Sequence, residues 1–264
     1  MKKAKLHKLK VPRATWDAFE ADTRYSVLLL GQIFNETIML HKLCLASRPG
    51  PDTTIAQTHA MFAQMSLLAR LLCGKIYEAH KALTAVEVKR FFFEVCFPLM
   101  PEGKGRELLK TFNRDVSTCR WLANARNGHA MHFPNSSQWA HAMSAMKDRK
   151  REFELIMGDT VGDSYFSSSA DVAAISFYLK ADSTDWQSGL QHFSDDVMKM
   201  TQSLNALIRH SLDAFFLQLL AKEIPKDRRA KIKNAKSFDR PAMRDCRIPF
   251  FLDFTEYEPS FDAF

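Results

Sequence analysis

The 264-residue chain contains few residues that break helices, with only 9 glycines and 10 prolines. Runs of β-branched residues are also scarce, whereas Leu, Ala, Met, Lys and Glu are common. Because these five residue types favour helices and β-branched residues favour strands, the composition predicts an all-α fold. The sequence has no internal repeat, no glycine-rich phosphate loop and no alternation of strand with helix, so an antiparallel helical bundle is the expected architecture.

Cysteine is too dispersed for a disulfide framework or a zinc site. The five cysteines form no CxxC pair. His41 and Cys44 lie three residues apart, but no second pair of ligands accompanies them, so a core-facing pair is favoured over a metal site. We therefore expect no metal, no other cofactor and a reducing compartment.

Neither a secretory signal nor a membrane-spanning segment is evident in the sequence. The basic N-terminus is not followed by an apolar stretch with a cleavage site. The longest apolar stretches are interrupted by charged residues, and none reaches the length that a bilayer requires. The sequence therefore predicts a cytoplasmic protein without a membrane partner.

The formal net charge of +7 comes from the two ends of the chain. Residues 1–13 carry six Lys or Arg and no acid, and residues 222–247 carry ten Lys or Arg against four acids. Residues 248–264 carry four acids and no Lys or Arg, so residues 14–221 are close to neutral. Basic arms of this kind bind polyanions through the release of counterions, and solvated tails are the alternative interpretation.

Apolar residues that recur at spacings of three and four predict several long helices. The expected long helices span residues 16–46, 53–83, 106–132, 135–157 and 186–221, with shorter segments at residues 88–97 and 170–179. The segment at 170–179 fits either a helix or a strand, and we expect a short helix. Proline and glycine in residues 48–52 and 98–105 separate neighbouring helices.

This pattern divides the chain into three parts. Residues 1–13 form a basic N-terminal arm, residues 14–221 form the helical bundle domain with additional short helices, and residues 222–264 form a C-terminal extension. The extension is basic to residue 247 and then acidic and aromatic. Its aromatic residues fall at spacings of four and three and are Phe250, Phe254, Tyr257, Phe261 and Phe264. We expect this tail to pack on its own domain, and docking on a partner or on a second copy is the alternative.

One segment, Arg126-Asn127-Gly128-His129-Ala130-Met131-His132-Phe133-Pro134, carries the chemistry that the rest of the chain lacks. It places a permanent cation, an amide and two imidazoles within about two helical turns. An arginine can hold a phosphate, and an imidazole can move a proton at neutral pH, which are two requirements of RNA cleavage. The structural alternative is that Arg126 and the histidines interact with the carbonyl groups at a helix C-terminus.

Residues 125–133 resemble the signature of HEPN-domain proteins, in which an arginine and a polar residue are followed four to six residues later by a histidine, near the end of a late bundle helix. The upstream stretch Leu67-Leu68-Ala69-Arg70-Leu71-Leu72-Cys73-Gly74-Lys75-Ile76-Tyr77-Glu78 is similar to the second bundle helix of bacterial HEPN proteins related to abortive-infection systems. The resemblance covers about residues 20–220. The segment from 134 to 222 is longer than in a minimal HEPN bundle, which is a departure from the family pattern.

The resemblance implies a metal-independent endoribonuclease that acts in phage defence or in a toxin–antitoxin pair. By this resemblance Arg126 would hold the scissile phosphate, His132 would act as general acid or base, and Asn127 would orient the pair. The additional His129 leaves the identity of the catalytic histidine open. From the sequence, Tyr77, Glu78 and His80 are expected to line a helix face, and Tyr77 or Glu78 could alternatively assist in the cleft. The resemblance also implies a homodimer, RNA as substrate, and an antitoxin or other regulatory protein as partner.

Two non-catalytic alternatives remain open from the sequence. In the first, a helical bundle binds nucleic acid through its basic arms and a protein partner through its aromatic tail. This alternative predicts salt-sensitive binding that persists in Arg126 and His132 variants and falls when residues 1–13 or 222–247 are deleted. In the second, the chain is a helical oligomerisation module without a role in nucleic-acid binding.

Overall fold

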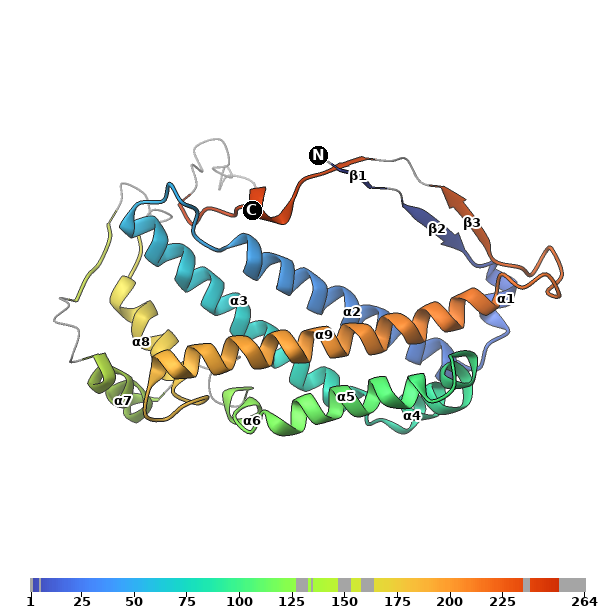
Figure 1. The fold of residues 1–264 in the computed structure, drawn as a ribbon, viewed down its shortest axis with the longest axis horizontal. Coiled ribbons are helices and arrows are strands. Elements are labelled where there is room, and N and C mark those ends of the chain that lie inside the picture. Colours follow the sequence, from blue (N-terminus) through green and yellow to red (C-terminus); the bar gives the residue numbers. More distant parts are fainter. Residues whose placement is uncertain are drawn as a thin grey trace, which may run out of the picture.

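The computed structural model describes residues 2–4, 6–126, 133, 135–146, 153–157, 164–234 and 238–251, and it is mostly helical (Figure 1). Three long helices form its frame: α2 (Ala21–Ala46), α3 (Ile55–Ala82) and α9 (Trp186–Gln218). Helix α2 packs against both α3 and α9. The predicted helical-bundle fold class is confirmed. None of the helices in the described part of the chain has the length and apolar character needed to cross a membrane.

Shorter helices cover the ends and one side of this frame. They are α1 (Arg13–Asp17), α4 (Val86–Arg90), α5 (Lys104–Thr118), α6 (Leu122–Ala125), α7 (Ser136–Met146) and α8 (Ser167–Tyr178). A π-helical turn (Phe91–Cys96) and two 3-10 turns (Phe97–Leu99 and Met243–Asp245) complete the helical elements that the structure describes. Helix α5 packs along α9, and α7 packs on α8. The ambiguous segment at 170–179 is helical, as predicted.

Side-chain caps determine where several helices begin. Thr54 accepts a hydrogen bond from the backbone of Gln57, and the Gln57 side chain accepts one from the backbone of Thr54, so α3 begins with a reciprocal capping box. Asn135 and Gln138 exchange the same pair of bonds before α7. Asp185 accepts bonds from two backbone amides in the first turn of α9. The caps at Thr54 and Asn135 lie at the starts of the helices predicted for residues 53–83 and 135–157.

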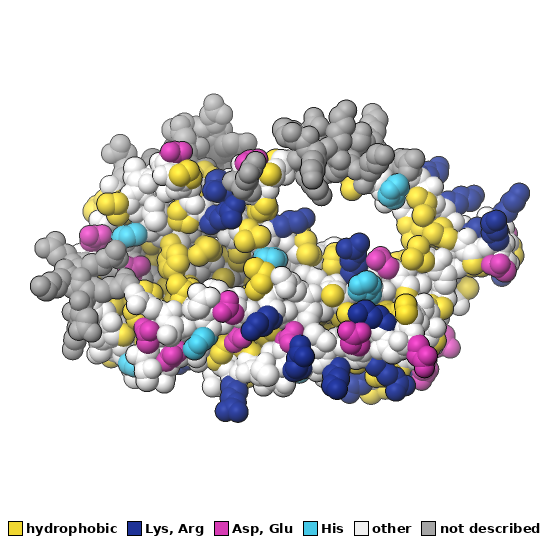
Figure 2. All heavy atoms as spheres, viewed as in Figure 1, with side chains coloured by type: hydrophobic (Ala, Val, Ile, Leu, Met, Phe, Trp, Pro, Cys, Tyr) yellow, Lys and Arg dark blue, Asp and Glu magenta, His cyan; other side chains and the backbone are white. Residues whose placement is uncertain are grey.

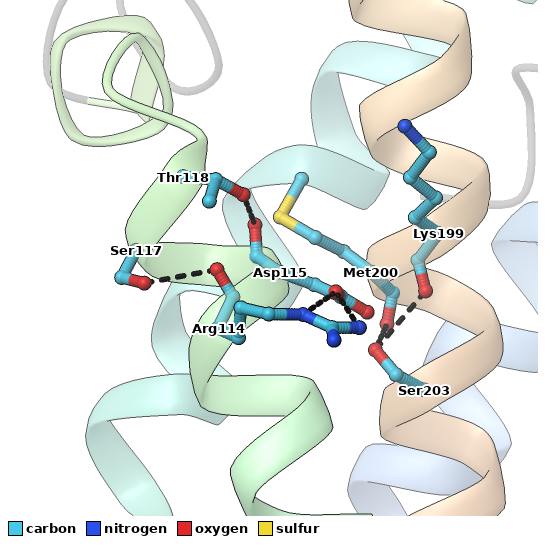
Figure 3. A network of polar contacts seen from close by, with 7 residues as sticks. All are labelled: Arg114, Asp115, Ser117, Thr118, Lys199, Met200 and Ser203. Atoms are coloured by element: carbon cyan, nitrogen blue, oxygen red, sulfur yellow. Dashed lines mark hydrogen bonds and ion pairs between the residues drawn. The ribbon is translucent and has the colours of Figure 1, made fainter.

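The continuous helix predicted for residues 106–132 is wrong, because α5 ends at Thr118 and α6 begins only at Leu122. Two hydroxyl groups satisfy carbonyl groups of the last turn of α5 (Figure 3): Ser117 donates to the carbonyl of Arg114 and Thr118 to that of Asp115. Trp121 then turns into the core, and its indole nitrogen donates to Asp196 of α9 over 2.9 Å.

Other helix boundaries also differ from the prediction. The first predicted helix is divided into α1 and α2, with a break at residues 18–20. The helix predicted for residues 135–157 is helical only to Met146 in the described part. Residues 153–157 are not helical, and Ile156 pairs with Tyr165. The second difference occurs where a pairing between distant residues overrides a local helical pattern.

A phenylalanine-rich core joins the long helices. One large cluster of buried residues includes Leu30, Ile76, Phe91, Phe112, Met200, Leu204 and Phe215. A smaller cluster lies between α7 and α8 and includes Ala142, Val172, Ile175 and Leu179. Most buried apolar side chains of α3 and α9 belong to the main cluster, since burial of apolar surface is the principal force that holds the helices together.

The two basic segments pair with each other as short antiparallel strands. Strand β1 (Lys2–Ala4) pairs with β4 (Phe238–Arg240), and β2 (His7–Lys10) pairs with β3 (Lys231–Asn234). In Figure 1 the β2–β3 pair lies above the end of α9, and Figure 2 shows an opening between the strands and the helices. The backbone amide of Ile248 donates to the carbonyl of Ala46, so the chain then returns to the end of α2.

Candidate functional site

Arg126 follows directly on α6, at the end of the short helix that continues from the Trp121 turn. The residue before it, Ala125, is fully buried, and Leu122 is buried in the same core. Helix α6 packs against α3. These contacts bring Arg126 to the surface of α3 that carries Tyr77 and Glu78.

The Arg126 side chain contacts both of those residues. Its Nη2 atom lies 2.7 Å from Oε1 of Glu78, and its guanidinium carbon lies 5.9 Å from the centre of the Tyr77 ring. The Arg126 side chain is 34% exposed and that of Glu78 is 48% exposed. The guanidinium is therefore oriented by a carboxylate and an aromatic ring while part of it stays accessible to a ligand.

A second cation shares the same aromatic ring. The Nζ atom of Lys81 lies 4.7 Å from the centre of the Tyr77 ring, one helical turn further along α3. Two cations and one carboxylate thus surround Tyr77, which gives this cluster an excess of positive charge and suits it to an anionic ligand. Lys81 was not among the sequence candidates, although its spacing of four from Tyr77 on a predicted helix is a signal that could have identified it.

Three of the four candidate residues lie outside the described residues. They are Asn127, His129 and His132, so their convergence with Arg126 stays a prediction. Phe133, which closes the signature, is described and is 97% exposed. The structure therefore places Arg126, Tyr77, Glu78 and Lys81 together and leaves the histidines to experiment.

One described histidine, His80, lies in the last turn of α3 itself. The ring centre of His80 is 5.8 Å from that of Phe112 in α5. Burial lowers the pKa of His80, and a side-chain hydrogen bond with Asn113 opposes that shift. The imidazole is consequently neutral at pH 7 and adds no charge to the cluster around Tyr77.

The other pair considered from the sequence, His41 and Cys44, lines an apolar cavity of about 190 Å³ between α2, α3 and α9. Burial raises the pKa of the Cys44 thiol to about 12 and lowers the pKa of His41. The thiol is therefore protonated at neutral pH and is a poor metal ligand or nucleophile. Among the described residues no cluster of three or more His, Cys, Asp or Glu side chains could hold a metal ion.

Comparisons with known proteins identified no relative of this chain. A scan against protein-family models, a search of curated proteins and a search of solved structures each found no match. The resemblance to HEPN proteins therefore depends on the two sequence segments quoted above.

Proposed function

We propose that the protein is a metal-independent endoribonuclease of the HEPN type. The observation that carries the proposal is the contact of Arg126 with Tyr77 and Glu78. The two sequence segments that resemble HEPN proteins are separated by almost fifty residues, and they supply the two sides of this contact. A family signature built from both segments requires that they meet in space, and the contact is consistent with that requirement.

In the proposed reaction Arg126 binds the scissile phosphate of RNA and stabilises the charge that develops on its oxygens. Glu78 and Tyr77 keep the guanidinium oriented between turnovers, since a carboxylate and a ring face both favour a fixed arginine geometry. Lys81 adds positive charge that attracts the RNA backbone.

The proposed chemistry uses the 2′-hydroxyl of RNA as the nucleophile. One of the two histidines, with His132 as the first choice and His129 as the second, accepts the proton of the 2′-hydroxyl. The 2′-oxygen bonds to phosphorus, the bond from phosphorus to the 5′-oxygen breaks, and a protonated imidazole delivers a proton to that oxygen. The products are a 2′,3′-cyclic phosphate and a 5′-hydroxyl, and DNA is not cut because it lacks the nucleophile. Asn127 hydrogen-bonds the phosphate or orients the histidine.

The proposal also includes the setting that the resemblance implies. Two copies of the chain would place their Arg126 segments in one shared cleft, and the partly exposed guanidinium is compatible with such an arrangement. The protein would act in the cytoplasm in phage defence or as a toxin restrained by an antitoxin or another regulatory protein.

Substitution of Arg126 and His132 tests the proposal. We expect Arg126→Ala and His132→Ala each to lower RNA cleavage at least about 100-fold, because each removes a group that acts on the transition state. Arg209→Ala is the matched control, since Arg209 is an exposed arginine in an ion pair with Asp213 on α9. Cleavage is followed on a labelled RNA, with helicity by circular dichroism and mass by light scattering.

The cleavage results of these variants distinguish the proposed reaction from its alternatives. Wild-type cleavage in both variants removes the proposal. An inactive His129→Ala variant beside an active His132→Ala variant keeps the reaction and moves the proton transfer to His129. RNA binding without cleavage in the wild-type protein favours the non-catalytic alternative.

A further inference from the structure

The β2–β3 strand pair has two faces of different character. The register places Lys8 opposite Lys233 and Lys10 opposite Lys231, with Leu9 opposite Ile232 between them. Because side chains alternate along a strand, the four lysines lie on one face and the two apolar residues lie on the other. We call the surface formed by Lys8, Lys10, Lys231 and Lys233 the lysine face.

The apolar face contacts the bundle through Leu9, whereas Ile232 opposite it is 53% exposed. Leu9 is half-buried and packs against the main core, as does Val11 just beyond the strand. The lysine face is consequently directed away from the core, and all four lysines are exposed. Figure 2 shows Lys and Arg side chains along the outer side of this strand pair and hydrophobic side chains on the side toward the helices.

The register places lysines of the lysine face directly opposite each other. Like charges directly opposite each other on paired strands destabilise the pair. In the part of the chain that the structure describes, none of the four lysines forms an ion pair with a carboxylate. The strand pairing thus brings together two lysine pairs that repel each other, from segments more than two hundred residues apart in sequence. Oppositely charged pairs at these positions would have stabilised the strands.

We propose that the lysine face is a binding surface for the phosphodiester backbone of nucleic acid. Consecutive lysines on each strand are two residues apart, so they are separated by about 6.6 Å along the strand. A small anion can neutralise one pair, whereas a polymer with one charge per unit can neutralise all four lysines at once. A two-stranded ribbon is also narrow enough to enter a wide groove of a nucleic acid.

The proposed binding does not depend on base sequence. Lysine acts as a point charge toward phosphate, and the lysine face contains no amide or arginine side chain that would read base edges. The inference is independent of the proposed cleavage, because the lysine face includes none of the residues around Arg126.

A charge-removal experiment tests this surface. One variant replaces all four lysines of the face by glutamine: Lys8→Gln, Lys10→Gln, Lys231→Gln and Lys233→Gln. The matched control replaces four exposed lysines on the helices, for which no ion pair is found in the described part of the chain: Lys42→Gln, Lys89→Gln, Lys110→Gln and Lys199→Gln. Both variants have the same net charge, and both are made with His129→Ala and His132→Ala, so that the probe is not cut whichever histidine transfers the proton.

Binding is measured by fluorescence anisotropy over a range of salt concentrations. The probes are labelled single-stranded RNA, single-stranded DNA of the same sequence and duplex DNA. For single strands we expect the slope of log affinity against log salt to become shallower by about 3 in the lysine-face variant, since each neutralised phosphate contributes about 0.7. The control variant should keep a slope close to that of the parent, and the lysine-face variant should unfold at the same or a higher temperature, because repulsion has been removed.

Several results would overturn the inference. They are an equal loss of affinity in both variants, an absence of salt-dependent binding in the parent, and tighter binding of the parent to anionic lipid vesicles or to poly-glutamate than to any nucleic acid. Loss of cleavage in Arg126→Ala with intact RNA binding does not contradict binding at the lysine face. Loss of binding in the lysine-face variant does not contradict the proposed cleavage chemistry, so each proposal can fail without the other.

Discussion

Gly189 shows how one atom can limit the contact between two helices. It lies in the first turn of α9, against the end of α8, and a Cβ atom added there would stand 2.2 Å from the carbonyl oxygen of Tyr178. A backbone carbonyl cannot rotate away as a side chain can. By contrast, a Cβ atom on Gly31, inside α2, would meet nothing within 4 Å.

The two glycines therefore give opposite predictions. We expect Gly189→Ala to lower the free energy of unfolding by roughly 2–3 kcal/mol, since the helices must separate to accept the methyl group. Gly31→Ala should raise it by about 0.5–1 kcal/mol, because alanine loses less backbone entropy in a helix. Urea denaturation of both variants measures the difference. A Gly189→Ala variant as stable as the parent would show that this close contact is not maintained in solution.

Single residues also show what the sequence could predict. The caps at Thr54 and Asn135 follow from local patterns, and both are present. Arg126 was identified from its neighbours in sequence, but its contact with Glu78 depends on how two helices pack, which a linear pattern does not specify. The roles of Asn127, His129 and His132 remain predictions that only the cleavage experiment addresses.

At the scale of elements, the break between α5 and α6 positions Arg126. Trp121 lies at this break, donates to Asp196 and packs against the rings of Phe177 and Phe193. Asp196 lies 75 residues further along the chain, so no local periodicity could reveal that the predicted helix divides here. The end of the helix predicted for residues 106–132 was therefore misplaced, because a sequence pattern does not show this long-range contact.

We expect Trp121→Phe to destabilise the protein by roughly 1.5–3 kcal/mol, because it removes a hydrogen bond to a partly buried carboxylate. Trp139→Phe in α7 is the control, since the buried indole nitrogen of Trp139 has no hydrogen-bond partner in the described part of the chain. Both substitutions keep an aromatic ring, so thermal denaturation isolates the effect of the bond. Equal destabilisation in the two variants would contradict the assigned role of Trp121.

At the scale of the whole molecule, the two basic ends of the chain are parts of one structure. Their strand pairing could have been anticipated in part, since Lys8-Leu9-Lys10 and Lys231-Ile232-Lys233 both alternate charged and apolar residues. The partnership itself joins segments more than two hundred residues apart. Composition predicted the helical bundle because each helix forms from contacts between residues close in sequence. The strand pairing was missed because it joins residues far apart in sequence.

Deletion of residues 1–10 tests how much the strands contribute to stability. Two-stranded pairings are marginal by themselves, and Leu9 is only half-buried, so we expect the free energy of unfolding to fall by roughly 1–2 kcal/mol. The helical signal in circular dichroism should be preserved, because the main core consists mainly of residues from the helices. A truncated chain that loses its helicity would show that the strands are required for folding.

The most direct test of the proposed function is the chemical form of the RNA ends produced in the presence of a metal chelator. The wild-type protein should cut RNA, leave DNA of the same sequence intact and release 2′,3′-cyclic phosphate and 5′-hydroxyl ends, with Arg126→Ala at least about 100-fold slower. Uncut RNA, cleavage that the chelator abolishes, or Arg126→Ala cutting at the wild-type rate would contradict the proposal.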